Sequence, residues 1–303
     1  MTASDGGSAN GPHGGYRRSM RRPFRQVDVF SETAYRGNPV AVVLDAEGIE
    51  DEDLRRFSVW TNLSECTFVL PPTTPDADYR VRIFSLEAEL AFAGHPTLGT
   101  ARAWLDAGGT PTKTDRIVQE CRAGLVPIRI ASDGLLSFSA PARTRAGAVA
   151  PDYLAKVAAV LGIDRNDVVD AEWLDNGAGW VGILLGDDEA VLNLTPSAAA
   201  YPGQWDIGVI GPVRRATGPD RPVFELRAFF SDGERTLRED PVTGSLNAAA
   251  AEWMLATGRA ATPYIARQGT TMGREGRVHI SEDDGRIWVG GRTSVAISGN
   301  VEL

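Results

Sequence analysis

The chain carries two copies of one sequence pattern, and this repeat limits the folds that are open to it. The segment YRVRIFS begins at Tyr79, and the similar segment FELRAFFS begins at Phe224, an offset of 145 residues. The segments HPTLGT and DPVTGS begin at His95 and Asp240, and their offset is the same. An interval of this length is too long for a solenoid repeat, so the pattern predicts a duplicated domain.

Short strand patterns and one alanine-rich helix recur in each copy. Segments such as VAVVL, CTFVL, WVGILL and RVHIS are β-branched or alternate in polarity, which is typical of strands. Surface helices are predicted over residues 51–60 and 151–162. The helix NAAAAEWMLATG is apolar on nearly all sides and must therefore be buried. We predict an α+β fold of two pseudo-symmetric halves, each a curved, mostly antiparallel sheet wrapped around a central Ala-rich helix.

Composition along the chain suggests where the halves begin and end. Residues 1–22 are rich in Gly, Ser and Asn and then in Arg, so we expect a disordered tail. The N-terminal half is predicted to span 23–140 and the C-terminal half 141–303. Interfaces between domains are favoured places for ligand sites, so we expect the active site between the halves.

Charge and cysteine content exclude several classes of function. The net charge of −9 argues against nucleic acid or an acidic membrane surface as a partner. No apolar run reaches the roughly 18 residues of a membrane span. The two cysteines, Cys66 and Cys121, are too few for a cysteine zinc site or a disulfide framework, and the three histidines are scattered, so no metal site is expected. These features fit a cytoplasmic protein that acts on a small molecule.

The starts of the two alanine-rich helices carry candidate site residues. Proline fits the first turn of a helix, so His95 and Asp240, each followed by Pro, are predicted to be the N-cap residues. Asp caps helices well, so Asp240 could be purely structural, whereas His is not a preferred cap. Two facing helix starts could bind a carboxylate through unpaired N–H groups. Gly94 and Gly244 either permit tight turns or let a ligand approach the backbone.

Glu65 is a third candidate, because it lies between a predicted helix and an apolar strand in WTNLSECTFVL. A buried carboxyl group has a raised pKa and can exchange protons near neutral pH. The alternative is an exposed carboxylate at the end of a strand. A further segment, RQGTTMGREG at 267–276, could contact an anion or form a plain turn.

Five of these motifs, in their order, resemble one known family. GNPVAVVLD, TNLSE, FAGHPTLGTA, DPVTGSLN and RQGTTMGR are similar to the PhzF (phenazine biosynthesis) family of the diaminopimelate epimerase-like superfamily, from about Phe24 to the C-terminus. The resemblance implies that Glu65 is the acid/base residue and that His95 and Asp240 assist it. It also places three residues near a substrate carboxylate: Gly94, Gly244 and Ser245. It further implies a homodimer that needs no metal or organic cofactor.

Three functions follow as hypotheses. The first is an isomerase that shifts a proton and a double bond in a small unsaturated cyclic carboxylate or amino acid of secondary metabolism, as the founding enzyme does with trans-2,3-dihydro-3-hydroxyanthranilate. The second is an amino-acid epimerase or racemase of the same fold. The related epimerases have two cysteines at the helix starts, where this chain has His95 and Asp240, so two-thiol racemisation is disfavoured. The third is a binding protein without catalytic activity.

Overall fold

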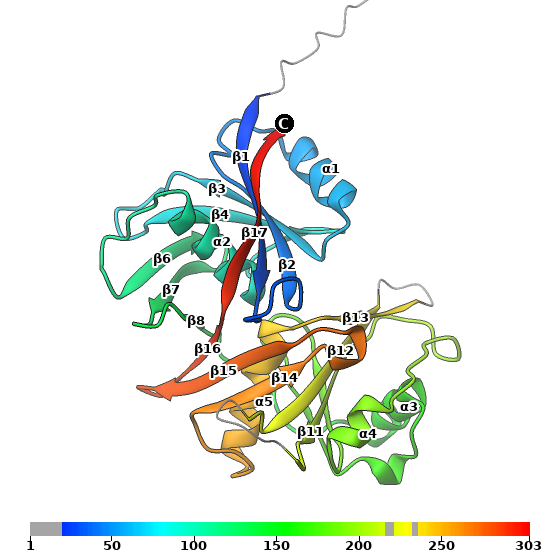
Figure 1. The fold of residues 1–303 in the computed structure, drawn as a ribbon. Helices are drawn as coiled ribbons and strands as arrows, with labels where there is room; N and C mark the ends of the chain where they lie inside the picture. Colours follow the sequence, from blue (N-terminus) through cyan, green and yellow to red (C-terminus); the bar gives the residue numbers. More distant parts are fainter. Residues whose placement is uncertain (1–19, 216–220, 232–235) are drawn as a thin grey trace, which may run out of the picture.

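The computed structural model describes residues 20–215, 221–231 and 236–303 (Figure 1). In the first part of the chain, the elements are β1 (Arg21–Val29), β2 (Asn38–Val43), α1 (Asp51–Thr61), β3 (Glu65–Leu70), β4 (Tyr79–Ser85), β5 (Glu89–Leu90), α2 (Gly94–Asp106), β6 (Arg116–Cys121), β7 (Gly124–Ile130) and β8 (Leu136–Ser139). The later elements are α3 (Pro151–Leu161), η1 (Arg165–Asp167), β9 (Asp170–Trp173), β10 (Val181–Leu184), α4 (Asp188–Leu192), β11 (Asp206–Pro212), β12 (Phe224–Ser231), β13 (Leu237–Asp240), α5 (Gly244–Ala256), β14 (Tyr264–Gln268), η2 (Thr270–Met272), β15 (Gly276–Asp283), β16 (Arg286–Gly291) and β17 (Thr293–Glu302). The expected surface helices are confirmed as α1 and α3, and the two repeated strand segments as β4 and β12.

The same series of strand pairings occurs twice along the chain. In the first lobe, β4 pairs antiparallel with β3 and parallel with β6, and β6 pairs antiparallel with β7. In the second, β12 pairs antiparallel with β11 and parallel with β14, and β14 pairs antiparallel with β15. Antiparallel pairing of β8 with β16 joins the two groups, so the sheet continues from one lobe into the other.

The last strand returns to the beginning of the chain. β17 runs antiparallel to β1 along its whole length, from Glu302 opposite Arg21 to Thr293 opposite Val29 (Figure 1). β2 pairs with one edge of β1, so β17 occupies the other edge of β1. The predicted C-terminal half, 141–303, is therefore wrong in its last strand. We call residues 20–140 together with β17 the N-terminal lobe, and the described residues of 141–292 the C-terminal lobe.

The predicted tail can be compared with the structure only at its end. Residues 1–19 lie outside the described residues. Arg21 and Arg22 belong to β1, so the predicted tail boundary at residue 22 is two residues too long. In the part of the chain that the structure describes, no helix is both long and apolar enough to cross a membrane.

The two alanine-rich helices are buried and meet at the junction of the lobes. In α5, Leu246 and the alanines 248–251 are almost completely inaccessible to solvent. The small side chains of the alanines let α5 pack against β15 and β16. α2 packs against β1, β2 and β3 of the N-terminal lobe. The first residues of the helices touch, since a Cβ atom built on Gly94 would lie 3.1 Å from the Cα atom of Gly244. Side chains of both helices belong to one continuous apolar core.

Candidate active site

The structure brings Glu65, His95 and Asp240 together at the junction of the lobes. Glu65 is the first residue of β3, His95 is the second residue of α2, and Asp240 is the last residue of β13. The Nδ1 atom of His95 lies 3.6 Å from Oε2 of Glu65. The side-chain amide of Asn38 lies between His95 and Asp240, with its Nδ2 atom 3.4 Å from His95 Nδ1 and 3.1 Å from Asp240 Oδ1. The site therefore contains groups from both lobes.

The prediction that His95 caps α2 is wrong. The N-cap is Ala93, whose backbone is extended, and the helix begins at Gly94. Pro96 is then the third helical residue, which it tolerates because an N–H group there needs no intrahelical partner. Proline therefore marks the first turn of a helix but not its cap. The imidazole of His95 is free of any capping role.

Asp240 is not an N-cap either. The N-cap of α5 is Thr243, and Asp240 lies three residues earlier, paired with Ala228 across β12 and β13. The helices begin at Gly94 and Gly244, an offset of 150 residues, whereas β4 and β12 keep the offset of 145. The connection between β12 and the helix is longer than its counterpart, so His95 and Asp240 do not occupy equivalent positions.

Glu65 lies in an environment that favours its protonated form. Its side chain is 19% exposed, and Oε2 has no hydrogen-bond partner among the described residues. Burial, together with the negative charge of Asp240, raises the pKa of Glu65 to about 8, and a hydrogen bond with Ser64 only partly opposes this. The alternative of an exposed strand-end carboxylate is therefore wrong.

His95 is neutral in this site. Its side chain is 4% exposed, and burial lowers the pKa of the imidazole to about 3, although interaction with the backbone of Pro39 opposes the shift. A neutral imidazole has one nitrogen that donates and one that accepts. His95 can therefore pass or hold a proton next to Glu65.

Asp240 is a half-buried acid that accepts hydrogen bonds from two side chains. Thr243 Oγ1 donates to its Oδ2 at 2.5 Å, and Asn38 Nδ2 donates to its Oδ1 at 3.1 Å. Burial raises the pKa of Asp240, the two donors lower it, and the charge of Glu239 raises it. Two ionised carboxylates repel each other strongly in a buried site, so Glu65 and Asp240 together retain a proton near neutral pH.

Three further polar residues of the site were missed by the sequence reasoning. Asn38, Thr243 and Gln268 are buried, and Gln268 Nε2 donates to Thr243 Oγ1 at 3.0 Å and to the Asp240 carbonyl at 3.1 Å. Thr243 N in turn donates to Gln268 Oε1 at 3.0 Å. A polar residue directly beside an apolar strand segment, such as Asn38 before PVAVV, is the signal that could have found them.

The glycines predicted near a substrate carboxylate lie at the contact between the helices. Gly94 and Gly244 are each the first residue of their helix, where N–H groups have no intrahelical partner and the dipole is positive. Ser245 follows Gly244, and its Oγ accepts a hydrogen bond from Trp180 Nε1 at 3.0 Å. Two converging helix starts give this place a positive potential that suits an anionic group.

The segment 267–276 forms a supported turn around η2. Arg267 pairs with Glu225 and, at 3.4 Å, with Asp188. Arg274 Nη1 donates to the carbonyl of Tyr35 at 3.1 Å. These contacts favour the plain turn over an anion site.

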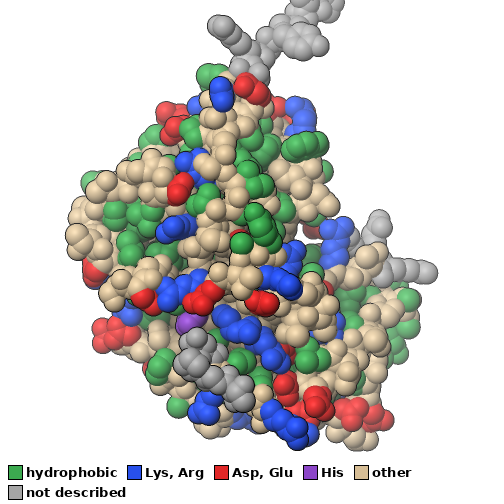
Figure 2. All heavy atoms as spheres, viewed as in Figure 1, with side chains coloured by type: hydrophobic (Ala, Val, Ile, Leu, Met, Phe, Trp, Pro, Cys, Tyr) green, Lys and Arg blue, Asp and Glu red, His purple; other side chains and the backbone are tan. Residues whose placement is uncertain are grey.

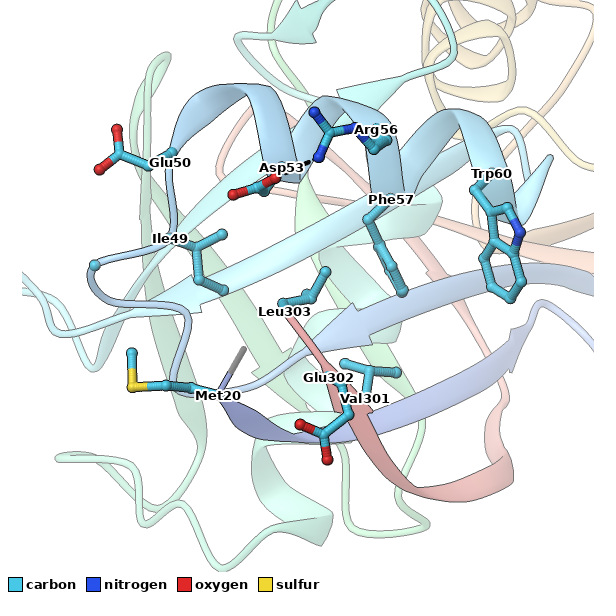
Figure 3. A pocket seen from close by; sticks show the side chains of 11 residues that line it. Met20, Ile49, Glu50, Asp53, Arg56, Phe57, Trp60, Val301, Glu302 and Leu303 are labelled. Atoms are coloured by element: carbon cyan, nitrogen blue, oxygen red, sulfur yellow. Dashed lines mark hydrogen bonds and ion pairs between the residues drawn. The ribbon is translucent and has the colours of Figure 1, made fainter. Parts of the chain in front are cut away.

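Other surface features do not coincide with this site. A groove of about 730 Å³ lies between α1 and the ends of β1 and β17 (Figure 3), and its lining includes none of the predicted site residues. On the face in Figure 2, basic and acidic side chains are interspersed. In the described residues, no three side chains of His, Cys, Asp or Glu are grouped so that they could hold a metal ion.

Known proteins share both the sequence and the fold. The family model for phenazine biosynthesis-like proteins, PhzC-PhzF, matches residues 27–301. The antisense-enhancing sequence 1 protein of Schizosaccharomyces pombe is 36% identical over 91% of this chain and 97% of its own length. The trans-2,3-dihydro-3-hydroxyanthranilate isomerase of Pseudomonas aeruginosa is 45% identical over 104 residues, which are 34% of this chain and 36% of that enzyme.

A solved structure agrees in fold. The phenazine biosynthesis protein of the PhzF family from Bacillus anthracis superimposes with a TM-score of 0.78 at 22% identity, covering 94% of this chain and 100% of that chain. The family model spans most of the chain, including every residue of the site described above. The chain therefore belongs to the PhzC-PhzF family of phenazine biosynthesis-like proteins.

Proposed function

We propose that the protein is an isomerase that shifts a proton and a double bond in a small unsaturated cyclic carboxylate or amino acid, without a cofactor. One observation carries this proposal: Glu65, whose pKa is about 8, lies 3.6 Å from a neutral His95 and close to a second half-buried acid, Asp240. A pKa near the working pH is what a general acid and base needs. Relatives named as isomerases support the same class of reaction.

In the proposed reaction, Glu65 moves a proton from one carbon of the substrate to another. Both its forms are accessible near neutral pH, because its pKa is about 8. The carboxylate form removes a proton from carbon, and the C–H electron pair moves into the conjugated system. The resulting glutamic acid returns the proton at the far end of that system, so no other reactant is consumed.

The remaining site residues would hold the substrate and its developing charge. The starts of α2 and α5 meet at Gly94 and Gly244, and their N–H groups would bind the substrate carboxylate. Donors that are fixed before the reaction stabilise negative charge as it forms. His95 and Asp240 would orient the substrate or relay a proton, and Ser245 would line the carboxylate end.

We also infer that the two lobes are pseudo-symmetric copies, each a sheet wrapped around its alanine-rich helix. The same series of antiparallel, parallel and antiparallel pairings in the two lobes supports this. α2 and α5 also have the same length of 13 residues. A site between two such copies would be lined by the N-terminus of one helix from each copy, α2 and α5.

Turnover of a substrate panel tests the proposed function. The purified protein is incubated with trans-2,3-dihydro-3-hydroxyanthranilate and related unsaturated cyclic amino acids, and the products are identified by NMR and chiral chromatography. A product with a shifted double bond is expected. A product that differs only in the configuration of one carbon would instead show an epimerase, and binding without any product would show a protein that has no catalytic role.

A further inference from the structure

Asn38 touches two of the three proposed catalytic groups. It is the first residue of β2, and its side chain is completely buried at the junction of the lobes. Its Nδ2 atom donates to Asp240 Oδ1 at 3.1 Å and to the carbonyl of Val242 at 3.0 Å, both in the C-terminal lobe. The same nitrogen lies 3.4 Å from His95 Nδ1 in the N-terminal lobe.

The backbone that carries Asn38 is held from several sides. Gly37 N donates to Asp28 Oδ2 at 3.1 Å, and a Cβ atom on Gly37 would lie only 2.2 Å from the carbonyl oxygen of Val29. Arg274 Nη1 donates to the Gly37 carbonyl at 3.3 Å. The constrained backbone and the two hydrogen bonds of Nδ2 together hold the Asn38 amide in one orientation. A side chain that is held in this way can orient the groups that it contacts.

The surroundings also fix which end of the Asn38 amide faces Asp240. If the amide were reversed, its oxygen would face two acceptors, the Asp240 carboxylate and the Val242 carbonyl. With Nδ2 in this place, its two hydrogens serve those two acceptors. The Nδ1 atom of His95 then receives only a weak contact, and it faces Glu65 Oε2 at 3.6 Å.

We propose that Asn38 is a positioning residue that, together with Thr243, keeps the Asp240 carboxylate ionised and so places the proton shared by the two acids on Glu65. Asp240 accepts hydrogen bonds from two side chains, whereas Glu65 has one such bond, with Ser64, and its Oε2 has none among the described residues. Donors favour the ionised form of the acid that they contact. The consequence for catalysis rests on the proposed function, whereas the placement of the proton does not.

Other groups around Asp240 do not provide this control. The negative charge of Glu239 opposes ionisation of Asp240, and Glu65 would do the same only when ionised. Glu239 is itself paired with Arg227 at 2.8 Å, and His95 is neutral. The hydrogen bonds from Asn38 and Thr243 are thus the contacts that favour the charged form.

Titration of the Asp240 carboxyl group tests the proposal directly. The group is followed by ¹³C NMR in Asp-labelled protein across pH 3–10, in the wild type and in Asn38→Ala and Thr243→Val variants, and kcat and KM are measured on the same samples. Each variant should raise the pKa of Asp240 by about 1–2 units, since a hydrogen bond to a charged group has roughly that effect. Because the Glu65 carboxylate is the form that removes the proton, the rise of kcat with pH should move to lower pH in each variant, while KM changes little.

Thr100→Val is the matched control for lost packing and lost hydrogen bonding. Thr100 Oγ1 donates to Thr67 Oγ1 at 2.8 Å, both residues are buried, and neither contacts Asp240. This variant should lose thermal stability without a change in the Asp240 titration. The proposal is overturned if Asn38→Ala and Thr243→Val leave that titration unchanged, or if Glu65 titrates below Asp240 in the wild type. If no substrate is turned over, the proposed function fails, but the titration still decides the placement of the proton.

Discussion

Two acids with the same chemistry differ because of the atoms around them. Glu65 is largely shielded from solvent and lies close to the negative charge of Asp240, whereas Asp240 receives hydrogen bonds from Thr243 and Asn38. Burial raises the pKa of both groups, and two hydrogen bonds oppose that rise at Asp240, whereas one opposes it at Glu65. An acid that stays protonated beside one that stays ionised can give and take a proton within one site.

The raised pKa of Glu65 makes stability depend on pH in a definite direction. Between the ordinary value of 4.5 and about 8, the folded protein holds a proton that the unfolded chain releases. The stabilisation is complete below pH 4.5 and is lost as the pH rises through 8. Glu65→Gln should therefore lose less stability than the wild type between pH 5 and 9 in urea unfolding. Parallel curves for the two proteins would contradict the buried, protonated state of Glu65.

Asp240→Asn should lower the pKa of Glu65. The substitution keeps the size of the side chain and removes the negative charge that raises the Glu65 pKa. Titration of ¹³C-labelled glutamate by NMR would measure the shift. A Glu65 pKa that stays near 8 in this variant would show that burial alone sets its value, and that the two acids do not interact.

At the level of residues, the sequence predicted Glu65, His95 and Asp240 as site residues, but not the polar side chains that contact them in the structure. The three lie in motifs with unusual local chemistry, such as a histidine before a proline at a helix start. Asn38 contacts residues that lie 57 and 202 positions away in the sequence, and no local pattern encodes such contacts. The burial that sets the pKa of Glu65 likewise depends on the assembled lobes.

At the level of elements, the strands keep the 145-residue offset of the sequence repeat, whereas the first residues of the helices do not. β4 and β12 share the predicted offset, but α2 and α5 begin 150 residues apart because the connection after β12 is longer. Apolar periodicity locates a strand or helix well, whereas loop length is free to differ between copies. A prediction of equivalent His95 and Asp240 positions therefore failed where a loop intervened.

The contact between α2 and α5 should not tolerate a side chain at Gly94. A Cβ atom there would lie 2.7 Å from Phe138 Cζ and 3.1 Å from Gly244 Cα. Gly94→Ala should destabilise the protein by about 1–3 kcal/mol through overpacking, although alanine is the better helix former. Gly186→Ala is the control, since nothing lies within 4 Å of its Cβ position. Equal stability of the two variants in denaturant unfolding would refute the close contact.

At the level of the whole molecule, the last strand, β17, lies beside the first strand, β1. The pairing of β17 with β1 joins residues that are between 264 (Val29 and Thr293) and 281 (Arg21 and Glu302) positions apart, and the pairing of β8 with β16 joins the lobes. A repeat predicts two separate copies, but it does not reveal that the last strand of the chain completes the first lobe. The position of β17 depends on the edge of β1 that β2 leaves unpaired, and this edge exists only in the assembled sheet.

Deletion of residues 293–303 should destabilise the N-terminal lobe. It removes the partner of one edge of β1 and uncovers Val27 and Val29, which are completely buried. The truncated protein should melt at a lower temperature, and β1 amides should lose their protection from hydrogen exchange. Ile297→Ser, at a half-exposed position of the same strand, is the mild control. Unchanged protection of β1 after the deletion would contradict the pairing.

The central claim is that Glu65 transfers a proton to and from carbon, and solvent exchange tests it most directly. Wild type, Glu65→Gln and the control Glu120→Gln, which alters a half-exposed carboxylate, are incubated in D₂O with each compound of the panel, and deuterium on carbon is followed by NMR. We predict deuterium incorporation by wild type and Glu120→Gln, and a loss of about 10²–10⁴-fold in Glu65→Gln, the usual contribution of a general acid or base. Incorporation by Glu65→Gln at the wild-type rate would show that another group moves the proton.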